Sequence, residues 1–399
     1  MNTEHYLDNA ATTKVRPEVK EEMLKYFDVV YGNPGSFHGK GLEAKDALED
    51  ARERVSKILN CKSKEIIFTA GGTESINLAL KGLAKSMKDK GNHIITSNIE
   101  HHAVLNTCEY LEKYEGCEVT YLEVDQYGMI NPNDVEKAIK ENTILITIMY
   151  ANNEIGTINP IKEIGEVAKK NNIYFHTDAC QAAGYESLNV EDLNVDMMTI
   201  NASKLYGPKG VGLLYVKTGI SLIPLVHGGG QERNLRSGTE NIPGIMGFVK
   251  ALELAQIEKE IEVTRLIKLR DELIKGILSS VPKTFLNGHP NKRLPNNVNV
   301  SILDIEGEAL ILYLNEYNIY CSTGSACTSQ TLDPSHVVIA TGLPYEAAHG
   351  SIRFTLGKET TESDINKVLE VLPGIVKILR QISPVNVNVE HMIEARSKK

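Results

Sequence analysis

Short apolar runs alternate with amphipathic stretches through the first half of the chain. Apolar, β-branched runs predict strands at about 65–70, 93–97, 118–124, 143–150, 173–179, 196–202 and 210–217. Helical spacing of apolar residues separates the earlier runs at about 74–86, 103–114, 134–141 and 160–171. Strands that alternate with helices are typical of βαβ units, so the pattern predicts an α/β sandwich around a mostly parallel, seven-stranded sheet.

The second half of the chain predicts a smaller α/β domain. A long helical segment at about 243–280 comes first. It is followed by a strand at Asn297–Ile302, a helix at about 306–317, a strand at about 351–356 and a helix at about 361–380.

Composition and charge narrow the class of protein. The chain has 399 residues, of which 42% are apolar and 24% charged, enough for two globular domains. Its net charge of −9 argues against nonspecific binding of nucleic acid. No apolar run approaches the roughly twenty residues of a membrane span, and Met1–His5 begin no export signal. We therefore expect a cytoplasmic protein that binds neither nucleic acid nor a membrane.

Lys204 ends one predicted strand and is followed by the turn Gly207–Gly210. A rigid strand end that presents an amine suits a Schiff base with pyridoxal phosphate, although most lysines in such places are solvated. Asp178 ends the preceding strand and is the candidate to hold the pyridinium nitrogen, although a turn or helix cap is commoner for aspartate there. Strand ends meet at one edge of a doubly wound sheet, which brings the two residues together.

A phosphate site is predicted where the first strand breaks into Gly71-Gly72-Thr73 before a helix. The free amides and the dipole of a helix N-terminus attract anions. Gly72 permits close approach and the Thr73 hydroxyl adds a donor.

The stretch Cys321–Ser329 is rich in small polar residues and predicts a mobile loop. A thiol on such a loop can reach a bound substrate, so Cys327 is the candidate nucleophile. The other cysteines fit inert packing better: Cys61, Cys108, Cys117, Cys180 and Cys321. The six cysteines contain no CxxC pair and lack zinc-ligand spacing, which favours a reducing cytoplasm.

Ordered motifs along the chain resemble those of one enzyme family. They are Asp8–Thr13, Gly32–His38, Glu100–Leu105, Asn152–Gly156 and Ser322–Cys327. In this order they resemble a cysteine desulfurase of the IscS/NifS group, over about residues 6 to 380. The resemblance implies the pyridoxal phosphate-dependent transferase fold, of the aspartate aminotransferase type. It also implies a large domain at 16–260 and a small domain of 1–15 and 261–399, which carries the cysteine loop at about 321–334.

The resemblance implies a cofactor site drawn from several motifs. Lys204 would bind pyridoxal 5'-phosphate covalently, and Asp178 would pair with the ring nitrogen. His101 would stack on the ring and would also act as an acid or base. Further contacts would come from Asn153 and Gln181 at the ring oxygen, from Gly72, Thr73, Asn201 and Ser203 at the phosphate, and from Thr239 at the phosphate of a dimeric neighbour. Arg353 matches the anchor for the substrate carboxylate, with Asn33 and Asn153 assisting.

The implied reaction converts L-cysteine to L-alanine and leaves a persulfide on Cys327. The sulfur would pass to an iron–sulfur scaffold of the IscU/NifU type or to a tRNA-thiolation enzyme, and the protein would be a homodimer. The resemblance also implies that Cys327 acts as a transient ligand of an iron–sulfur cluster shared with the scaffold.

One departure from the family concerns the residue before the lysine, which is Ser203 where the family usually has histidine. Serine retains a hydroxyl donor, so we expect cofactor binding that is kept but weaker. Asn201 likewise replaces the more usual serine. Two alternatives remain open: a selenocysteine lyase or another enzyme of this fold type, which would not need Cys327, and a weakly active sulfur-carrier or scaffold subunit.

Overall fold

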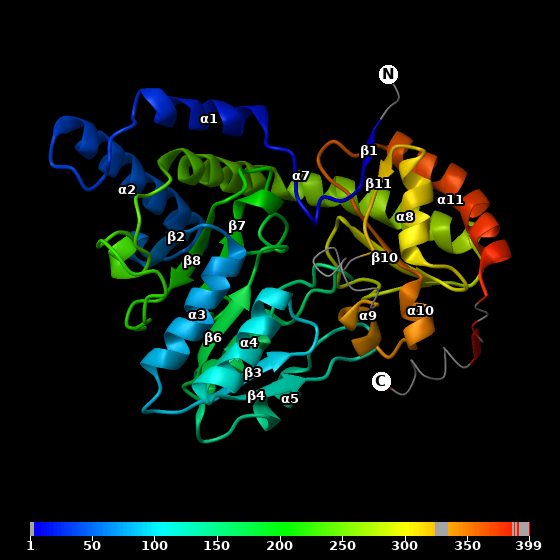
Figure 1. The fold of residues 1–399 in the computed structure, drawn as a ribbon, viewed down its shortest axis with the longest axis horizontal. Helices are drawn as coiled ribbons and strands as arrows, with labels where there is room; N and C mark the ends of the chain where they lie inside the picture. The colour runs from blue at the N-terminus through cyan, green and yellow to red at the C-terminus, as the bar shows by residue number, and fades with distance from the viewer. Residues whose placement is uncertain (1–3, 324–333, 385–386, 388, 391–398) are drawn as a thin grey trace.

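The computed structural model describes residues 4–323, 334–384, 387, 389–390 and 399. At its centre is a seven-stranded sheet in the order β2-β8-β7-β6-β5-β3-β4 (Figure 1). The bounds are β2 Ile66–Thr69, β3 His93–Ser97, β4 Glu118–Leu122, β5 Thr143–Thr147, β6 Tyr174–Asp178, β7 Met197–Asn201 and β8 Gly212–Val216. Strands β3 to β7 pair in parallel and only β8 is antiparallel to its neighbours, so the predicted mostly parallel sheet is confirmed.

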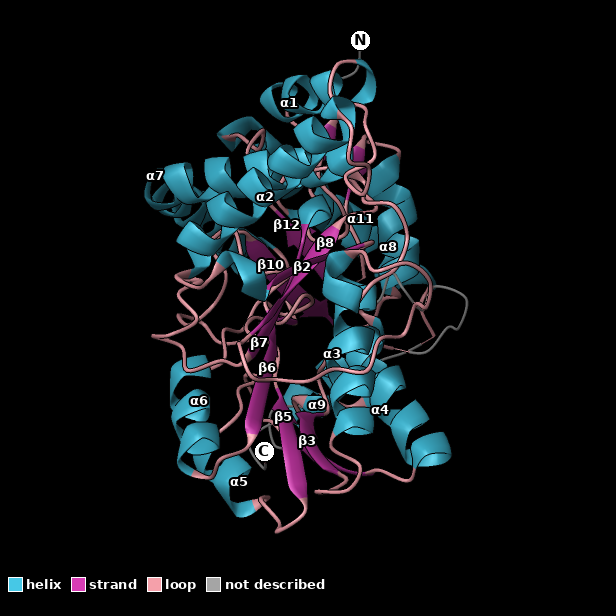
Figure 2. Cartoon of the chain, turned by 90° about the vertical axis from the view of Figure 1, so that its left-hand side faces the viewer, coloured by secondary structure: helices cyan, strands magenta, loops and turns pink. Residues whose placement is uncertain are grey.

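Both faces of this sheet are covered by helices, which explains the continuous apolar runs of its strands. Leu145 and Leu214 pack against the helices of one face, whereas Ile146 and Leu213 pack against those of the other. Figure 2 shows α3 and α4 on one side of the strands and α6 on the opposite side. These helices are α2 Gly39–Leu59, α3 Gly72–Ser86, α4 His102–Glu115, α5 Pro132–Lys137, α6 Ile161–Lys170 and α7 Ile242–Ser280.

A buried histidine links the three central strands. The Nδ1 atom of His176 on β6 lies 2.9 Å from the Thr147 hydroxyl of β5, and Nε2 lies 3.0 Å from the Thr199 hydroxyl of β7. Burial lowers the pKa of His176 to about 4, so the ring is neutral at physiological pH. A neutral imidazole donates from one nitrogen and accepts at the other, which suits two hydroxyl partners.

A smaller α/β layer follows in sequence. Its antiparallel sheet has the order β12-β10-β9, and its apolar cluster includes the second half of α7 together with α8 and α11. The bounds are β9 Thr284–Leu286, β10 Asn297–Ile302, α8 Gly307–Asn315, β12 Ser351–Thr355 and α11 Glu362–Ile382.

The N-terminal segment packs with this smaller layer rather than with the large sheet. Strand β1 (His5–Tyr6) pairs in parallel with β11 (Ile319–Tyr320), and the two lie side by side in Figure 1. The next residue, Leu7, is fully buried in the same apolar cluster as Ile319 and Phe354.

The structure refines several sequence predictions. It adds helices α1 (Pro17–Asp28), α2, α9 (His336–Ala340) and α10 (Tyr345–His349), which the sequence analysis did not predict. The predicted helix at 134–141 is the shorter α5, which Pro132 begins. The strand before Lys204 ends at Asn201, and a single 3-10 turn, η2 (Ala202–Lys204), carries the lysine. None of the helices in the described part of the chain combines the length and apolar character that crossing a membrane demands.

A buried ion pair attaches α2 and the short 3-10 turn η3 (Glu232–Asn234) to the edge strand β2. Arg52 donates to Glu232 over 2.8 Å and to the carbonyl oxygen of Ile66 over 2.6 Å. Glu232 in turn accepts from the amide of Phe68 over 2.8 Å, and both charged side chains are almost fully buried.

Glu232→Gln should therefore lower the free energy of unfolding by about 3 kcal/mol, because it removes the buried counter-ion of Arg52 and leaves only the half-exposed Glu49 at 3.3 Å. Equilibrium urea unfolding measures the change. The matched control is Glu53→Gln on the same helix, since Glu53 pairs with Lys57 in solvent and should leave the unfolding midpoint nearly unchanged. Equal midpoints for the two variants would contradict this role of the buried pair.

Candidate active site

A cavity of about 330 Å³ lies at the carboxyl ends of the parallel strands. It brings together many of the residues predicted from the sequence: Gly72, Thr73, His101, Asn153, Asp178, Gln181, Asn201, Lys204 and Arg353. Residues from motifs far apart along the chain thus share one enclosed space, as open α/β sheets with ligands at their strand ends arrange them.

Lys204 and Asp178 reach the cavity from neighbouring parallel strands. Asp178 ends β6, is only 7% exposed, and accepts from the amide of Cys180 at Oδ1 over 2.9 Å. Lys204 follows β7, and its Nζ atom donates to the carbonyl oxygen of Ala11. The strand pairing, with Asp178 opposite Thr199, explains why both side chains come to the same edge.

The phosphate cradle predicted at Gly72 has the expected form. Helix α3 begins at Gly72, so its first amides have no carbonyl partner within the helix. A methyl group on Gly72 would lie 2.9 Å from Sγ of Cys180 and 3.5 Å from Nδ2 of Asn201. The Asn201 side chain also has a buried Oδ1 with no hydrogen-bond partner among the described residues.

These features fit pyridoxal phosphate by their chemistry. The start of α3 offers amide donors for a phosphate, Asp178 offers a carboxylate for a protonated ring nitrogen, and Lys204 offers the amine. Gln181 donates from Nε2 to the carbonyl oxygen of Ala10 over 3.0 Å, which fixes its amide on the cavity wall.

His101 is both a helix cap and a cavity residue. Its Nδ1 accepts from the amide of Ala103 over 3.0 Å at the start of α4. This bond assigns the proton of the neutral ring to Nε2 and fixes the orientation of the imidazole. His102, to which the sequence assigned no role, also lines the cavity, with its ring centroid 4.7 Å from that of His336.

Arg353 projects from β12 and is 2% exposed. Its Nη1 donates to the backbone carbonyl oxygen of Asn153 and its Nη2 to Oδ1 of Asp8, each over 2.9 Å. The contact with Asn153 thus uses the main chain. Asp8 belongs to a motif that was noted in the sequence, but its pairing with Arg353 was not foreseen.

Some predicted site residues do not line this cavity. Asn33 is exposed and accepts from the amide of Gly35 over 2.9 Å, Thr239 is exposed, and the Ser203 carbonyl oxygen accepts from Thr13. Their predicted roles stay predictions, and for Thr239 that role requires a second subunit. Cys327 lies outside the described residues.

Sequence reasoning missed several residues that line the cavity, among them Glu100, Glu154, Cys180 and His336. Glu100 and Glu154 each stood inside a noted motif, which was the only available signal. Burial raises the pKa of the Cys180 thiol well above its ordinary value, so this thiol fits the inert packing expected. Burial also raises the thiol pKa of the other described cysteines: Cys61, Cys108, Cys117 and Cys321.

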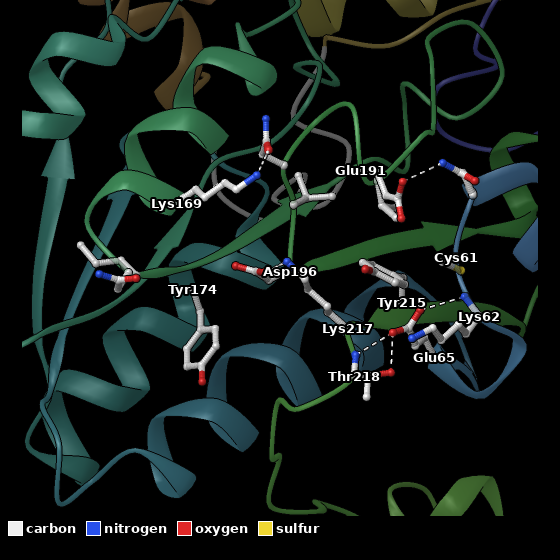
Figure 3. A pocket seen from close by; sticks show the side chains of 16 residues that line it. Cys61, Lys62, Glu65, Lys169, Tyr174, Glu191, Asp196, Tyr215, Lys217 and Thr218 are labelled. Carbon is white, nitrogen blue, oxygen red and sulfur yellow. Dashed lines mark hydrogen bonds and ion pairs between the residues drawn. The ribbon is translucent and has the colours of Figure 1, made fainter.

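A larger and more open cavity, of about 880 Å³, lies where β6 and β7 begin (Figure 3). Three of its charged side chains already have partners on the cavity wall: Glu65 accepts from the Thr218 hydroxyl, and Lys217 pairs with Asp196 over 3.0 Å. None of the predicted site residues lies there, so the smaller cavity is the candidate active site.

Comparison with known proteins identifies the family of this chain. Residues 5–368 match the family model for class V aminotransferases. A cysteine desulfurase IscS of Methanosarcina thermophila is 55% identical over 379 residues, covering 95% of this chain and 93% of the relative. A cysteine desulfurase IscS of Dictyoglomus turgidum is 52% identical over 384 residues, covering 96% and 97%.

Solved structures give the same picture. A NifS-like protein is 40% identical with a TM-score of 0.89, covering 94% of this chain and all of its own. The structure described as SspA in complex with cysteine is 38% identical with a TM-score of 0.78, covering 89% and 99%. The chain belongs to the class V aminotransferase family and, within it, to the cysteine desulfurases. The predicted fold class, enzyme class and pyridoxal phosphate cofactor are thereby confirmed.

Gly72→Ala should weaken the binding of pyridoxal phosphate at least about tenfold, equivalent to about 1.4 kcal/mol, because its methyl group enters the cradle. Titration of the cofactor-free protein, followed by visible absorbance, measures the affinity. Gly374→Ala is the control, since a methyl group there meets no atom within 4 Å. If both variants bind the cofactor as the parent protein does, the phosphate lies elsewhere.

Proposed function

We propose that this cysteine desulfurase uses the candidate active site to take sulfur from L-cysteine and carries it as a persulfide on Cys327, releasing L-alanine. The observation that supports the proposal most is the convergence of Lys204, Asp178 and Arg353 on one cavity. It unites an amine, a carboxylate and a guanidinium, the groups that binding a cofactor and an amino acid requires.

In this proposal Arg353 binds the substrate. Its planar guanidinium suits the carboxylate of an amino acid, and its bonds to Asn153 and Asp8 hold it against the cavity. Asn33 and Asn153 assist in this role. The relative that was solved with cysteine supports L-cysteine as the substrate.

Lys204 moves the proton of the substrate α-carbon, because its amine is freed when the substrate binds. Gly72, Thr73, Asn201 and Ser203 would hold the phosphate, and Asp178, Gln181, Asn153 and His101 the ring. When bound, pyridoxal phosphate supplies an electron sink for the negative charge on the α-carbon. His101, with the proton of its neutral ring on Nε2, is placed to stack on the ring and to exchange a proton there.

In this proposal Cys327 accepts the sulfur atom. Its thiolate attacks the substrate sulfur, so a sulfur–sulfur bond forms while the carbon–sulfur bond breaks. The electron pair of the broken bond stays with the substrate carbon, which takes up a proton and leaves as alanine.

We further propose a homodimer in the cytoplasm, in which Thr239 reaches the neighbour's phosphate. Large apolar side chains are exposed around α1 and α2, including Phe27, Tyr31 and the 96% exposed Phe37, which supports a protein partner there. The domain division at residues 16–260 remains part of this proposal. So does delivery of sulfur to an iron–sulfur scaffold or a tRNA-thiolation enzyme, with Cys327 as a transient cluster ligand.

Lys204→Ala should abolish alanine formation and covalent retention of the cofactor, because it removes the only amine assigned to the cavity. Mass spectrometry after borohydride reduction locates the cofactor on the chain. The control is Lys209→Ala in the following turn, whose lysine is exposed and bonds to the carbonyl oxygen of Thr13. Cofactor found on the Lys204→Ala chain, together with normal turnover, would disprove the assignment.

Cys327→Ser should bind L-cysteine but release no alanine, because the nucleophile for sulfur is gone while Arg353 and Lys204 remain. Cys321→Ser should stay active, since burial raises the pKa of the Cys321 thiol and keeps it protonated. Alanine release under reducing conditions measures both. The reverse pattern would overturn the mechanism, and turnover of L-selenocysteine by Cys327→Ser would favour a selenocysteine lyase.

A further inference from the structure

Glu100 is a fully buried carboxyl group on the wall of the candidate active site. It lies between β3 and α4, directly before His101. Its Oε1 accepts from the Ser97 hydroxyl over 2.6 Å and from the Met149 amide over 3.0 Å. Its Oε2 is buried and has no hydrogen-bond partner among the described residues.

A negative charge at this position has no ion-pair partner in the described part of the chain. No lysine, arginine or histidine side chain there forms an ion pair with Glu100, although Lys204 and Arg353 line the same cavity. The backbone carbonyl oxygen of Glu100 is engaged separately, at 3.1 Å from Nε2 of His336. A buried carboxylate without a counter-ion is costly, so such a group normally retains its proton.

Asp178 and Glu154 are the other carboxyl groups that line this cavity. The side chains of Glu100 and Asp178 differ in their surroundings. Burial raises the pKa of Glu100 to about 8, and the charge of Asp178 adds to the rise. The bonds from Ser97 and Met149 and the nearby His101 ring act against this rise in the pKa. When two neighbouring carboxyl groups have different environments, one can stay protonated while the other is ionised.

We propose that Glu100 is a positioning residue held as a neutral acid, so that of Glu100 and Asp178 only Asp178 carries a charge, and the Oε2 hydroxyl of Glu100 offers a donor to the cavity. Its Oε1 ties the end of β3 to the segment after β5, which fixes the start of α4 and with it His101. The proposal rests on the proposed function in one respect, that the cavity holds pyridoxal phosphate.

Other groups on the same cavity also titrate or carry charge. They come from α4 (His102, with His101 as its cap), β6 and the turn after it (Asp178, Cys180), η2 (Lys204), the loop after β5 (Glu154), α9 (His336) and β12 (Arg353). The experiment therefore compares two proteins at each pH, so that the contributions of these groups cancel.

The test replaces Glu100 by glutamine, which has the shape of the neutral acid and cannot ionise. Urea unfolding of the full-length protein is measured between about pH 5 and 9 for the parent and for Glu100→Gln. In the parent, the folded chain keeps a proton that the unfolded chain loses above its ordinary pKa of about 4.3. The unfolding constant of the parent, divided by that of Glu100→Gln, should therefore rise about tenfold per pH unit up to about pH 8 and then level off.

The matched control is Glu166→Gln on the exposed surface of α6, whose unfolding constant should keep a fixed ratio to that of the parent. A fixed ratio for Glu100→Gln as well would overturn the proposal. If Glu100→Gln does not fold, infrared spectroscopy of the parent protein provides the test. The carbonyl stretch of a buried neutral carboxylic acid is expected at pH 7 and should be absent at pH 9.5. Its absence at pH 7 would equally overturn the proposal.

Cofactor affinity supplies the functional readout. Ionised Glu100 adds a further anion to a cavity that must accept a phosphate, so the affinity of the parent for pyridoxal phosphate should fall relative to Glu100→Gln above about pH 8. An unchanged ratio of affinities would show that Glu100 does not act on the cofactor. Failure of the desulfurase assay would instead count against the proposed function, because the unfolding and infrared results do not depend on turnover.

Discussion

The parallel register of β5, β6 and β7 is the constraint on which the site depends. Side chains alternate between the two faces of a strand, so a slip of one residue would turn Asp178 away from Lys204. His176 opposes such a slip, because its neutral ring bonds to Thr147 on one side and to Thr199 on the other. The group that fixes the register is thus two residues from Asp178, the carboxylate assigned to the cofactor in the proposed function.

The smaller layer contributes to the site through the loop that contains Asn153. Arg353 on β12 holds the Asn153 carbonyl oxygen, and the side chains of Asn297 and Asn299 on β10 donate to the carbonyl oxygen of Glu154, each over 3.0 Å. The N-terminal segment adds Asp8 to the same contact. The end of the cavity at Arg353 therefore requires both layers in place, whereas the end at Gly72 and Asp178 is built mainly from the large sheet.

The parts of the site that could be predicted from the sequence are those with a local signature. Asp178 follows an apolar run, and Gly72 sits between a strand and a helix, so each could be placed at a strand end before any contact was known. Asp8 and Arg353 are 345 residues apart along the chain, and no periodicity reveals that they meet. The burial of Glu100 was equally hidden, because a glutamate in a turn normally faces solvent.

The order in which the chain is synthesised bears on the N-terminal segment. The last strand of the large sheet ends at Val216, so that sheet has all its strands before Ile319 is made. Leu7 is made before the large sheet, yet its apolar partners, such as Ile319 and Phe354, are made after it. During translation Leu7 and β1 must wait exposed beside a nearly finished large sheet, a period in which chaperone binding would protect the nascent chain from aggregation.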